Sequence, residues 1–157
     1  MSSKRSINCS ICVSTYNRPD ALLLCIESLL KQSYLPNEII IGDDGSGSET
    51  AELIALFQHK TNIPILHVWQ PDEGYRLAAC RNKSFAAAKG EYIIQIDGDV
   101  ILHKHFVADH LRMAKSGTFV SGSRVLLTPA VMISVRSVSN FSIVAVAPIC
   151  TNKSVSN

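Results

Sequence analysis

Short apolar runs alternate with stretches of helical periodicity along this chain, and this alternation constrains the fold more than any other feature. The runs of strand length and β-branched character are 6–15, 38–44, 63–69, 91–96 and 118–127. Apolar residues recur at helical spacing between them, over 19–32, 49–58, 77–90 and 105–117. Pro19 suits a first helical turn, and Gly90 and Gly117 predict helix stops. The β-α-β order predicts an α/β domain with a mostly parallel, helix-flanked sheet and right-handed crossovers.

Composition limits the classes of function. The 157 residues are 46% hydrophobic and 18% charged, which is typical of one globular domain with a real core. A formal charge of +2 gives no electrostatic reason to expect nucleic acid as a partner. No apolar run approaches the roughly 18 residues of a membrane span, and the N-terminus does not resemble a signal peptide. We therefore expect a cytoplasmic protein, with peripheral attachment at the inner face of the membrane as the alternative.

The cysteines favour a reducing environment. There are five, an odd number that cannot pair completely within one chain. Cys9 and Cys12 form a C-x-x-C, but no second pair at matching spacing completes a zinc site. Residues three apart in a strand also point to opposite faces. We interpret these cysteines as reduced core thiols.

The C-terminal part has a different composition. No Asp or Glu occurs from His110 to Asn157. We divide the chain into a ligand-binding domain, 1–128, and an atypical tail, 129–157, which is an extra strand or two, a poorly ordered end or a foreign ending produced by a change of reading frame.

Acidic residues follow two of the predicted strands. Asp97-Gly98-Asp99 ends one and Asp43-Asp44 ends another. The carboxyl ends of parallel strands share one edge of a sheet, so we expect these residues to meet there with the polar segment at 15–18. Neighbouring carboxylates repel each other unless a cation offsets them, and Mg²⁺ or Mn²⁺ binds one or two carboxylates together with substrate phosphates. This pattern predicts a metal–diphosphate site.

Each of these motifs has a simpler interpretation. Asp-Gly is itself a turn signal, and the residues after Asp44 could cap a helix through Ser46 or Ser48. Arg76 and Arg81, near the start of the third helix, suit a diphosphate but could be exposed surface charges.

Two further groups remain open. His103 and His105 form an H-x-H that could bind a metal, although Lys104 between them favours a solvated loop. Trp69 and Tyr75 border the loop after the third strand, where they could stack on a base or sugar or pack in the core.

Three segments in this order resemble the family 2 glycosyltransferases: 10–46, 72–100 and 121–127. These are inverting enzymes with the Rossmann-like GT-A nucleotide-sugar-binding fold. The resemblance extends from about residue 6 to 127 and is greatest to bacterial enzymes with chondroitin-polymerase-like or galactosyltransferase-like halves. It implies a nucleotide-sugar donor, most often a UDP-sugar, with Mn²⁺ or Mg²⁺ as cofactor and a glycan or other hydroxyl acceptor.

The resemblance also implies roles for individual residues. Asp97-Gly98-Asp99 matches the D-x-D of the family, with Asp97 towards the ribose and Asp99 towards the metal. The remaining matches bind the nucleotide: Thr15, Tyr16, Asn17, Arg18, Asp43, Asp44, Arg81 and, with less support from the motif, Arg76. This sequence departs from the family pattern in one respect. In the family, the Asp or Glu that acts as the catalytic base lies well after the D-x-D. Here the only later acid is Asp109, so we assign no catalytic base.

Three hypotheses follow. The chain is a metal-dependent glycosyltransferase or its donor-binding half, or it is a nucleotide-binding remnant without turnover. The third alternative is a phosphatase of the haloacid dehalogenase type, whose strand-end D-x-D is similar, but those enzymes need further acidic residues downstream.

Overall fold

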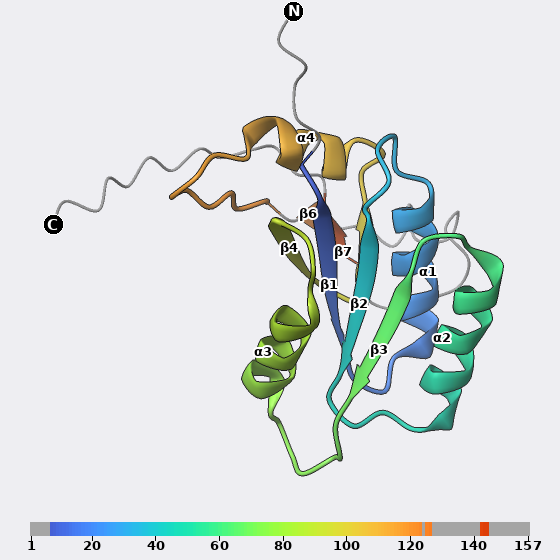
Figure 1. Cartoon of the computed structure of the whole chain (residues 1–157). Coiled ribbons are helices and arrows are strands. Elements are labelled where there is room, and N and C mark those ends of the chain that lie inside the picture. The colour runs from blue at the N-terminus through green and yellow to red at the C-terminus, as the bar shows by residue number, and fades with distance from the viewer. Residues whose placement is uncertain (1–6, 124, 127–141, 145–157) are drawn as a thin grey trace, which may run out of the picture.

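The centre of the molecule is a four-stranded parallel sheet (Figure 1). The computed structural model describes residues 7–123, 125–126 and 142–144. The sheet order is β3-β2-β1-β4, and its strands are β1 (Cys9–Thr15), β2 (Glu38–Asp43), β3 (Ile65–Trp69) and β4 (Tyr92–Asp97). In register, Val13 lies between Ile41 on one side and Ile96 on the other. The mostly parallel α/β fold predicted from the sequence is confirmed.

Helices cover both faces of this sheet. The helices are α1 (Pro19–Leu30), α2 (Ser48–Lys60), α3 (Leu77–Ala87) and α4 (Phe106–Met113). Figure 1 shows α1 and α2 on one face and α3 on the other. The face changes because the chain moves outward from β1 to β3 and then returns to place β4 on the far side of β1. This reversal creates a switch point between β1 and β4, where open α/β sheets bind their ligands.

The two faces of the sheet are packed differently. Towards α1 and α2, alternate strand residues such as Ile11 and Ile41 join one apolar core with Leu22 and Phe57. On the α3 side, β1 presents the small residues Ser10, Cys12 and Ser14, and a Cβ added at Gly42 would collide with Ser84 of α3. The absence of a side chain at Gly42 therefore lets α3 pack directly against β2. Within the described residues, no helix is long and apolar enough to cross a bilayer.

The described cysteines belong to this interior. Cys9, Cys12, Cys25 and Cys80 are buried free thiols. Burial raises the pKa of Cys9 to about 12 and that of Cys12 to about 11, which keeps both protonated. The expectation of reduced core thiols is confirmed for these four, and Cys150 lies outside the described residues.

A second, small sheet differs from the prediction. The expected strand over 118–127 is reduced to β6 (Val125–Leu126), which pairs antiparallel with β7 (Ser142–Val144). The segment before it contains Ser121, Gly122 and Ser123, which offer little apolar surface to bury. β7 also pairs in parallel with β5 (Val100–Leu102), a strand that the sequence analysis missed. The rest of the predicted 129–157 tail lies outside the described residues.

Several helix ends also differ from the prediction. α3 and α4 end before Gly90 and Gly117, so neither glycine directly stops its helix. Gly90 instead permits close approach, because a Cβ there would lie 2.6 Å from the backbone nitrogen of Ser10. α2 begins at Ser48, which was one of the two serines expected to start it, but its N-cap is Gly47 and no side chain caps it.

Candidate functional site

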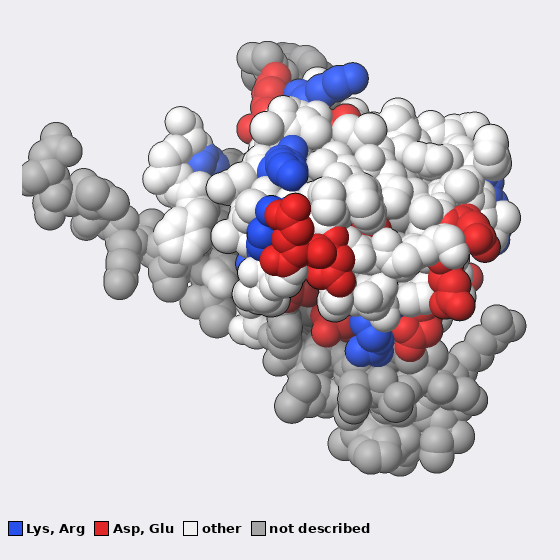
Figure 2. All heavy atoms as spheres, turned by 90° about the horizontal axis from the view of Figure 1, so that it is seen from below, with Lys and Arg blue, Asp and Glu red and all other residues white. Residues whose placement is uncertain are grey.

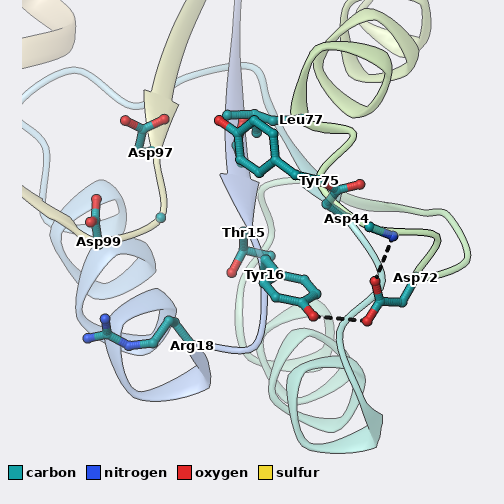
Figure 3. A pocket seen from close by; sticks show the side chains of 12 residues that line it. Thr15, Tyr16, Arg18, Asp44, Asp72, Tyr75, Leu77, Asp97 and Asp99 are labelled. Carbon is teal, nitrogen blue, oxygen red and sulfur yellow. Dashed lines mark hydrogen bonds between the residues drawn. The ribbon is translucent and has the colours of Figure 1, made fainter.

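A cavity of about 320 Å³ opens at the carboxyl ends of β1, β2 and β4 (Figure 3). The loops after these three strands and the loop before α3 supply its walls. The described residues that line it are Ser14, Thr15, Tyr16, Arg18, Asp44, Asp72, Gly74, Tyr75, Leu77, Asp97, Gly98 and Asp99. The predicted meeting of the strand ends at one edge of the sheet is therefore confirmed.

The charge of this lining is strongly one-sided. Among the described lining residues, Asp44, Asp72, Asp97 and Asp99 are acidic and only Arg18 is basic. Figure 2 views the molecule from this edge and shows several groups of acidic side chains on it, with basic side chains beside some of them. The cavity alone would repel an anion, so an anionic ligand needs a cation beside it.

Asp97 and Asp99 form one side of the cavity in Figure 3, and they differ in their partners. Arg81, on α3, donates from Nη2 to Asp97 Oδ1 over 2.6 Å and from Nε to Ser14 Oγ over 3.3 Å. In contrast, Asp99 Oδ1 is buried without a hydrogen-bond partner among the described residues. An unpartnered buried carboxylate oxygen is costly, and a bound cation would remove that cost.

These two carboxylates could provide part of a metal site. Within the described ranges, no group of three or more His, Cys, Asp or Glu side chains could hold a metal ion. A hard divalent cation with one or two carboxylates and ligand oxygens fits this donor set, because Mg²⁺-type ions are commonly bound in this way. Asp97 and Asp99 therefore fit such an ion if the ligand completes its coordination.

Gly98 brings the turn after β4 against the end of β1. Its backbone nitrogen donates to Ser14 O over 2.7 Å, and a Cβ at this position would lie 3.0 Å from the same oxygen. Its φ is outside the left-handed region, so the glycine serves close packing here. The contact fixes Asp97 and Asp99 relative to β1.

Asp44 holds the opposite wall. It is 5% exposed, its Oδ1 accepts from Gln70 Nε2 over 2.5 Å, and its Oδ2 accepts from the backbone nitrogen of Arg76 over 2.9 Å. Both ends of the 70–76 loop are thereby attached to the end of β2. The wall is built on the carboxylate that the sequence analysis assigned to the ligand.

The middle of this loop lies close against Gly45 and accepts a hydrogen bond from Tyr16. Gly45 has a φ of 102°, and a Cβ there would lie 2.5 Å from Asp72 Cα. The Tyr16 hydroxyl donates to Asp72 Oδ2 over 2.9 Å, and this hydrogen bond, with the nearby negative charge, raises the pKa of Tyr16. The 70–76 loop is therefore positioned by the protein's own contacts in the absence of a ligand.

Two aromatic rings stand on this side of the cavity. Tyr75 is 89% exposed and Tyr16 is 49% exposed, and Figure 3 shows both rings on the side of Asp44. Core packing is thus wrong for Tyr75. Trp69 is half exposed, does not line the cavity and donates from Nε1 to Ser46 O over 3.2 Å. Tyr16 and Tyr75 offer surface on which a planar ligand group could stack.

Four residues predicted for the site lie behind the cavity or beside it: Asn17, Asp43, Arg76 and Arg81. The guanidinium group of Arg76 donates hydrogen bonds to the Glu73 carboxylate and to the carbonyl oxygen of Pro71, both within its own loop. Arg81 acts on the cavity through its ion pair with Asp97. His103 and His105 are exposed, as the solvated-loop interpretation expected, and they do not line the cavity.

Asp43 is fully buried and, unlike its neighbour Asp44, does not line the cavity. Its Oδ2 lies 2.9 Å from His67 Nε2, and its Oδ1 accepts from the backbone nitrogen of Ser46 over 2.8 Å. Burial acts to raise the pKa of Asp43, but the hydrogen bonds from His67 and Ser46 outweigh it and hold the pKa below its usual range. The group is therefore a carboxylate with an internal role.

The sequence analysis missed several lining residues, namely Ser14, Asp72, Gly74 and Leu77. Asp72 and Gly74 belong to the polar loop after the third strand, which leaves the same edge of the sheet as the acidic strand ends. The position of this loop at the carboxyl end of a parallel strand could have indicated Asp72 and Gly74 as lining residues.

The fold and the site together define an α/β domain with an acidic cavity at its switch point. The family model for Glycosyl transferase family 2 matches residues 10–129, so the chain belongs to this family. Among its relatives, glycosyltransferase GlyG of Streptococcus pneumoniae is 36% identical over 62% of this chain and 32% of that protein. Chondroitin synthase of Escherichia coli is 33% identical over 66% of this chain and 15% of that protein. The chain thus spans less than a third of these two relatives.

Solved structures confirm the GT-A type of fold. A mannosyltransferase from Pyrobaculum calidifontis, solved with GDP-Man and Mn²⁺, aligns with a TM-score of 0.66 and 18% identity over 74% of this chain and 35% of that one. TarS of S. aureus, residues 1–349 solved with UDP, aligns with a TM-score of 0.55 and 25% identity over 66% of this chain and 30% of that one. These findings give the phosphatase alternative no support.

Proposed function

We propose that the chain provides the donor site of a glycosyltransferase and that the cavity holds a nucleotide sugar, with a UDP-sugar as the donor. The observation that carries this proposal is that Asp44, Asp97 and Asp99 line one cavity at the switch point. Family membership and the likeness to TarS, which was solved with UDP, support it.

The two sides of the cavity suit the two ends of such a donor. On the side of Asp44, the rings of Tyr16 and Tyr75 can contact the planar base, and the carboxylate can accept hydrogen bonds from the base or ribose. On the other side, Asp97 and Asp99 would hold Mn²⁺ or Mg²⁺ beside the diphosphate. When bound, such an ion stabilises the negative charge that develops on the leaving nucleoside diphosphate.

The protein's own residues orient this second side. Arg81 fixes one oxygen of Asp97, and Gly98 fixes the backbone between the two acids. Asp99 keeps its buried oxygen available for a cation. In the reaction that we propose, the sugar passes with inversion to a hydroxyl group of a glycan acceptor.

A second candidate is nucleotide binding without turnover, and the position of Asp109 favours it. Asp109 is the only acidic residue after Asp99. It lies on α4, where its Oδ1 is 3.1 Å from Arg112 Nη2, and it does not line the cavity. Asp109, the one described carboxylate that follows Asp99, is therefore not placed to act as a base for an acceptor hydroxyl at this cavity. Sugar transfer from a UDP-sugar to a glycan acceptor would decide for the enzyme.

Donor binding is tested by titration calorimetry with UDP in the presence of Mn²⁺. We expect a Kd below about 1 mM, a binding free energy of at least about 4 kcal/mol, and loss of binding when EDTA removes the metal. Mg²⁺ in place of Mn²⁺ is the metal control. Absence of binding heat at millimolar UDP with Mn²⁺ would contradict the proposal.

Tyr75→Ala tests the aromatic side of the cavity. We expect UDP affinity to fall about fivefold, because an aromatic contact contributes about 1 kcal/mol. The melting temperature should stay unchanged, since the side chain is 89% exposed. Phe119→Ala is the matched control, because Phe119 is 70% exposed and does not line the cavity. Equal Kd values for both variants in calorimetry would exclude Tyr75 as a ligand contact.

A further inference from the structure

A chain of hydrogen bonds runs behind the cavity from β3 to the loop after β1. His67 Nε2 lies 2.9 Å from Asp43 Oδ2, and the Ser46 backbone nitrogen donates to Asp43 Oδ1 over 2.8 Å. Ser46 Oγ accepts in turn from the backbone nitrogen of Asn17 over 2.8 Å. Asn17 Oδ1 then accepts from the backbone nitrogen of Gly47 over 3.1 Å. We call these four links the Asp43 relay.

We propose that Asp43 is a positioning residue of the donor site, acting through Ser46 and Asn17 on the two cavity residues Tyr16 and Arg18. This inference rests on the proposed function for its ligand, while its geometric part concerns the ligand-free protein. It gives Asp43 a role different from that of Asp44.

Asn17 connects the Asp43 relay to the cavity, because it is bonded within the relay and lies between two cavity-lining residues in the chain. Its φ of 47° is left-handed, which costs free energy for any residue with a side chain and is tolerated best by Asn and Asp. The relay offsets this cost by satisfying both the backbone nitrogen and the side-chain oxygen of Asn17. The residues on either side, Tyr16 and Arg18, both line the cavity. Their directions therefore depend on the conformation of Asn17.

Asp43 can act only indirectly. Its side chain is fully buried, both of its oxygens are engaged within the protein, and it does not line the cavity. The bond to Ser46 shapes the turn after β2 and so places the Ser46 hydroxyl beneath Asn17. Trp69 also donates to the carbonyl oxygen of Ser46, which fixes that turn from β3. The effect of Asp43 on ligand binding that we propose passes through Ser46, the partner that connects it to Asn17.

The test compares Ser46→Ala, Asp43→Asn and the double variant in two measurements. Calorimetry gives the Kd for UDP with Mn²⁺, and amide NMR of the ligand-free protein reports Tyr16 and Arg18. Ser28→Ala is the matched control. Ser28 is also a buried serine whose Oγ accepts a distant backbone N–H, that of Leu102 over 3.1 Å, but it lies away from the cavity.

We expect Ser46→Ala to weaken UDP binding about fivefold and Asp43→Asn about tenfold, with Ser28→Ala within twofold of the wild type. Because both variants interrupt one path, the double variant should lose clearly less than the roughly fiftyfold product of the two effects. In the ligand-free protein, Asp43→Asn should shift the amide signals of Tyr16 and Arg18, whereas Ser28→Ala should leave them in place.

Two results would overturn the inference. One is multiplication of the two effects on Kd, which means that Asp43 and Ser46 act independently. The other is an Asp43→Asn spectrum in which the Tyr16 and Arg18 amides do not move. If no form of the protein binds UDP, the proposed function fails, and the ligand-free spectra alone decide whether Asp43 positions the loop. If Asp43→Asn does not fold, both the Kd for UDP and the Tyr16 and Arg18 amide signals are measured on Ser46→Ala instead. Wild-type values in both would then overturn the inference.

Discussion

Asp99→Asn is expected to weaken UDP binding in the presence of Mn²⁺ by about a hundredfold, because removing one partner of a buried charge interaction costs about 3 kcal/mol. In the ligand-free protein the same change should leave the free energy of unfolding unchanged or raise it. The reason is that Asp99 Oδ1 is buried without a partner among the described residues, and a neutral amide is less costly to bury than a carboxylate. We therefore expect Asp99→Asn to lose UDP affinity without losing folding stability.

Asp109→Asn is the control for this change. It also removes one negative charge, but Asp109 pairs with Arg112 on α4 and does not line the cavity. Calorimetry with and without Mn²⁺, together with thermal unfolding, separates the two variants. If Asp99→Asn binds UDP with the wild-type Kd and the wild-type dependence on Mn²⁺, Asp99 is not a metal ligand.

Gly45→Ala is expected to have the second large effect, on stability and binding together. At a φ of 102°, an alanine is strained, and its Cβ would lie 2.5 Å from Asp72 Cα. Left-handed strain and the steric overlap together should lower the free energy of unfolding by about 3 kcal/mol. For a chain of this size, that corresponds to a fall in Tm of about 10 °C. UDP binding should weaken as well, because Asp72 moves with the 70–76 loop.

Gly47→Ala provides the comparison two residues away. Its φ of −75° is ordinary, and a Cβ there meets no described atom within 4 Å. Thermal unfolding of Gly47→Ala should therefore resemble that of the wild type. Similar Tm values for both alanine variants would show that the close approach of Asp72 to Gly45 does not persist in solution.

The sequence was sufficient to predict the elements that place the site. Short apolar runs located the four parallel strands, since a strand buried on both faces needs such a run. The acidic residues at the ends of β2 and β4 then predicted a shared edge, and Asp44, Asp97 and Asp99 do line one cavity.

The different roles of Asp43 and Asp44 could not be predicted. The two residues are identical and adjacent, and their roles depend on partners far along the chain. His67 and Ser46 engage Asp43, whereas Gln70 and Arg76 engage Asp44. Spacing along a sequence does not show which carboxylate turns inward, because that is decided by the tertiary packing of the neighbouring strand.

The small second sheet was missed for a similar reason. β5 and β6 are very short, and their pairing with β7 joins residues as distant as Ile101 and Ile143. A strand of two or three residues has too little periodicity to be identified by itself. Its formation depends on a partner that the local sequence does not reveal.

The attachment of the 70–76 loop has a kinetic consequence. Asp44 bonds both ends of the loop, Tyr16 bonds its middle, and Gly45 lets it pack closely, so this wall is in place without a ligand. A ligand does not have to wait for the loop to fold over it, and little entropy is lost there on association. For the proposed donor, we therefore expect the rate of association to depend on diffusion and on the arrival of the proposed cation, and the lifetime of the complex to depend on how long that cation is retained.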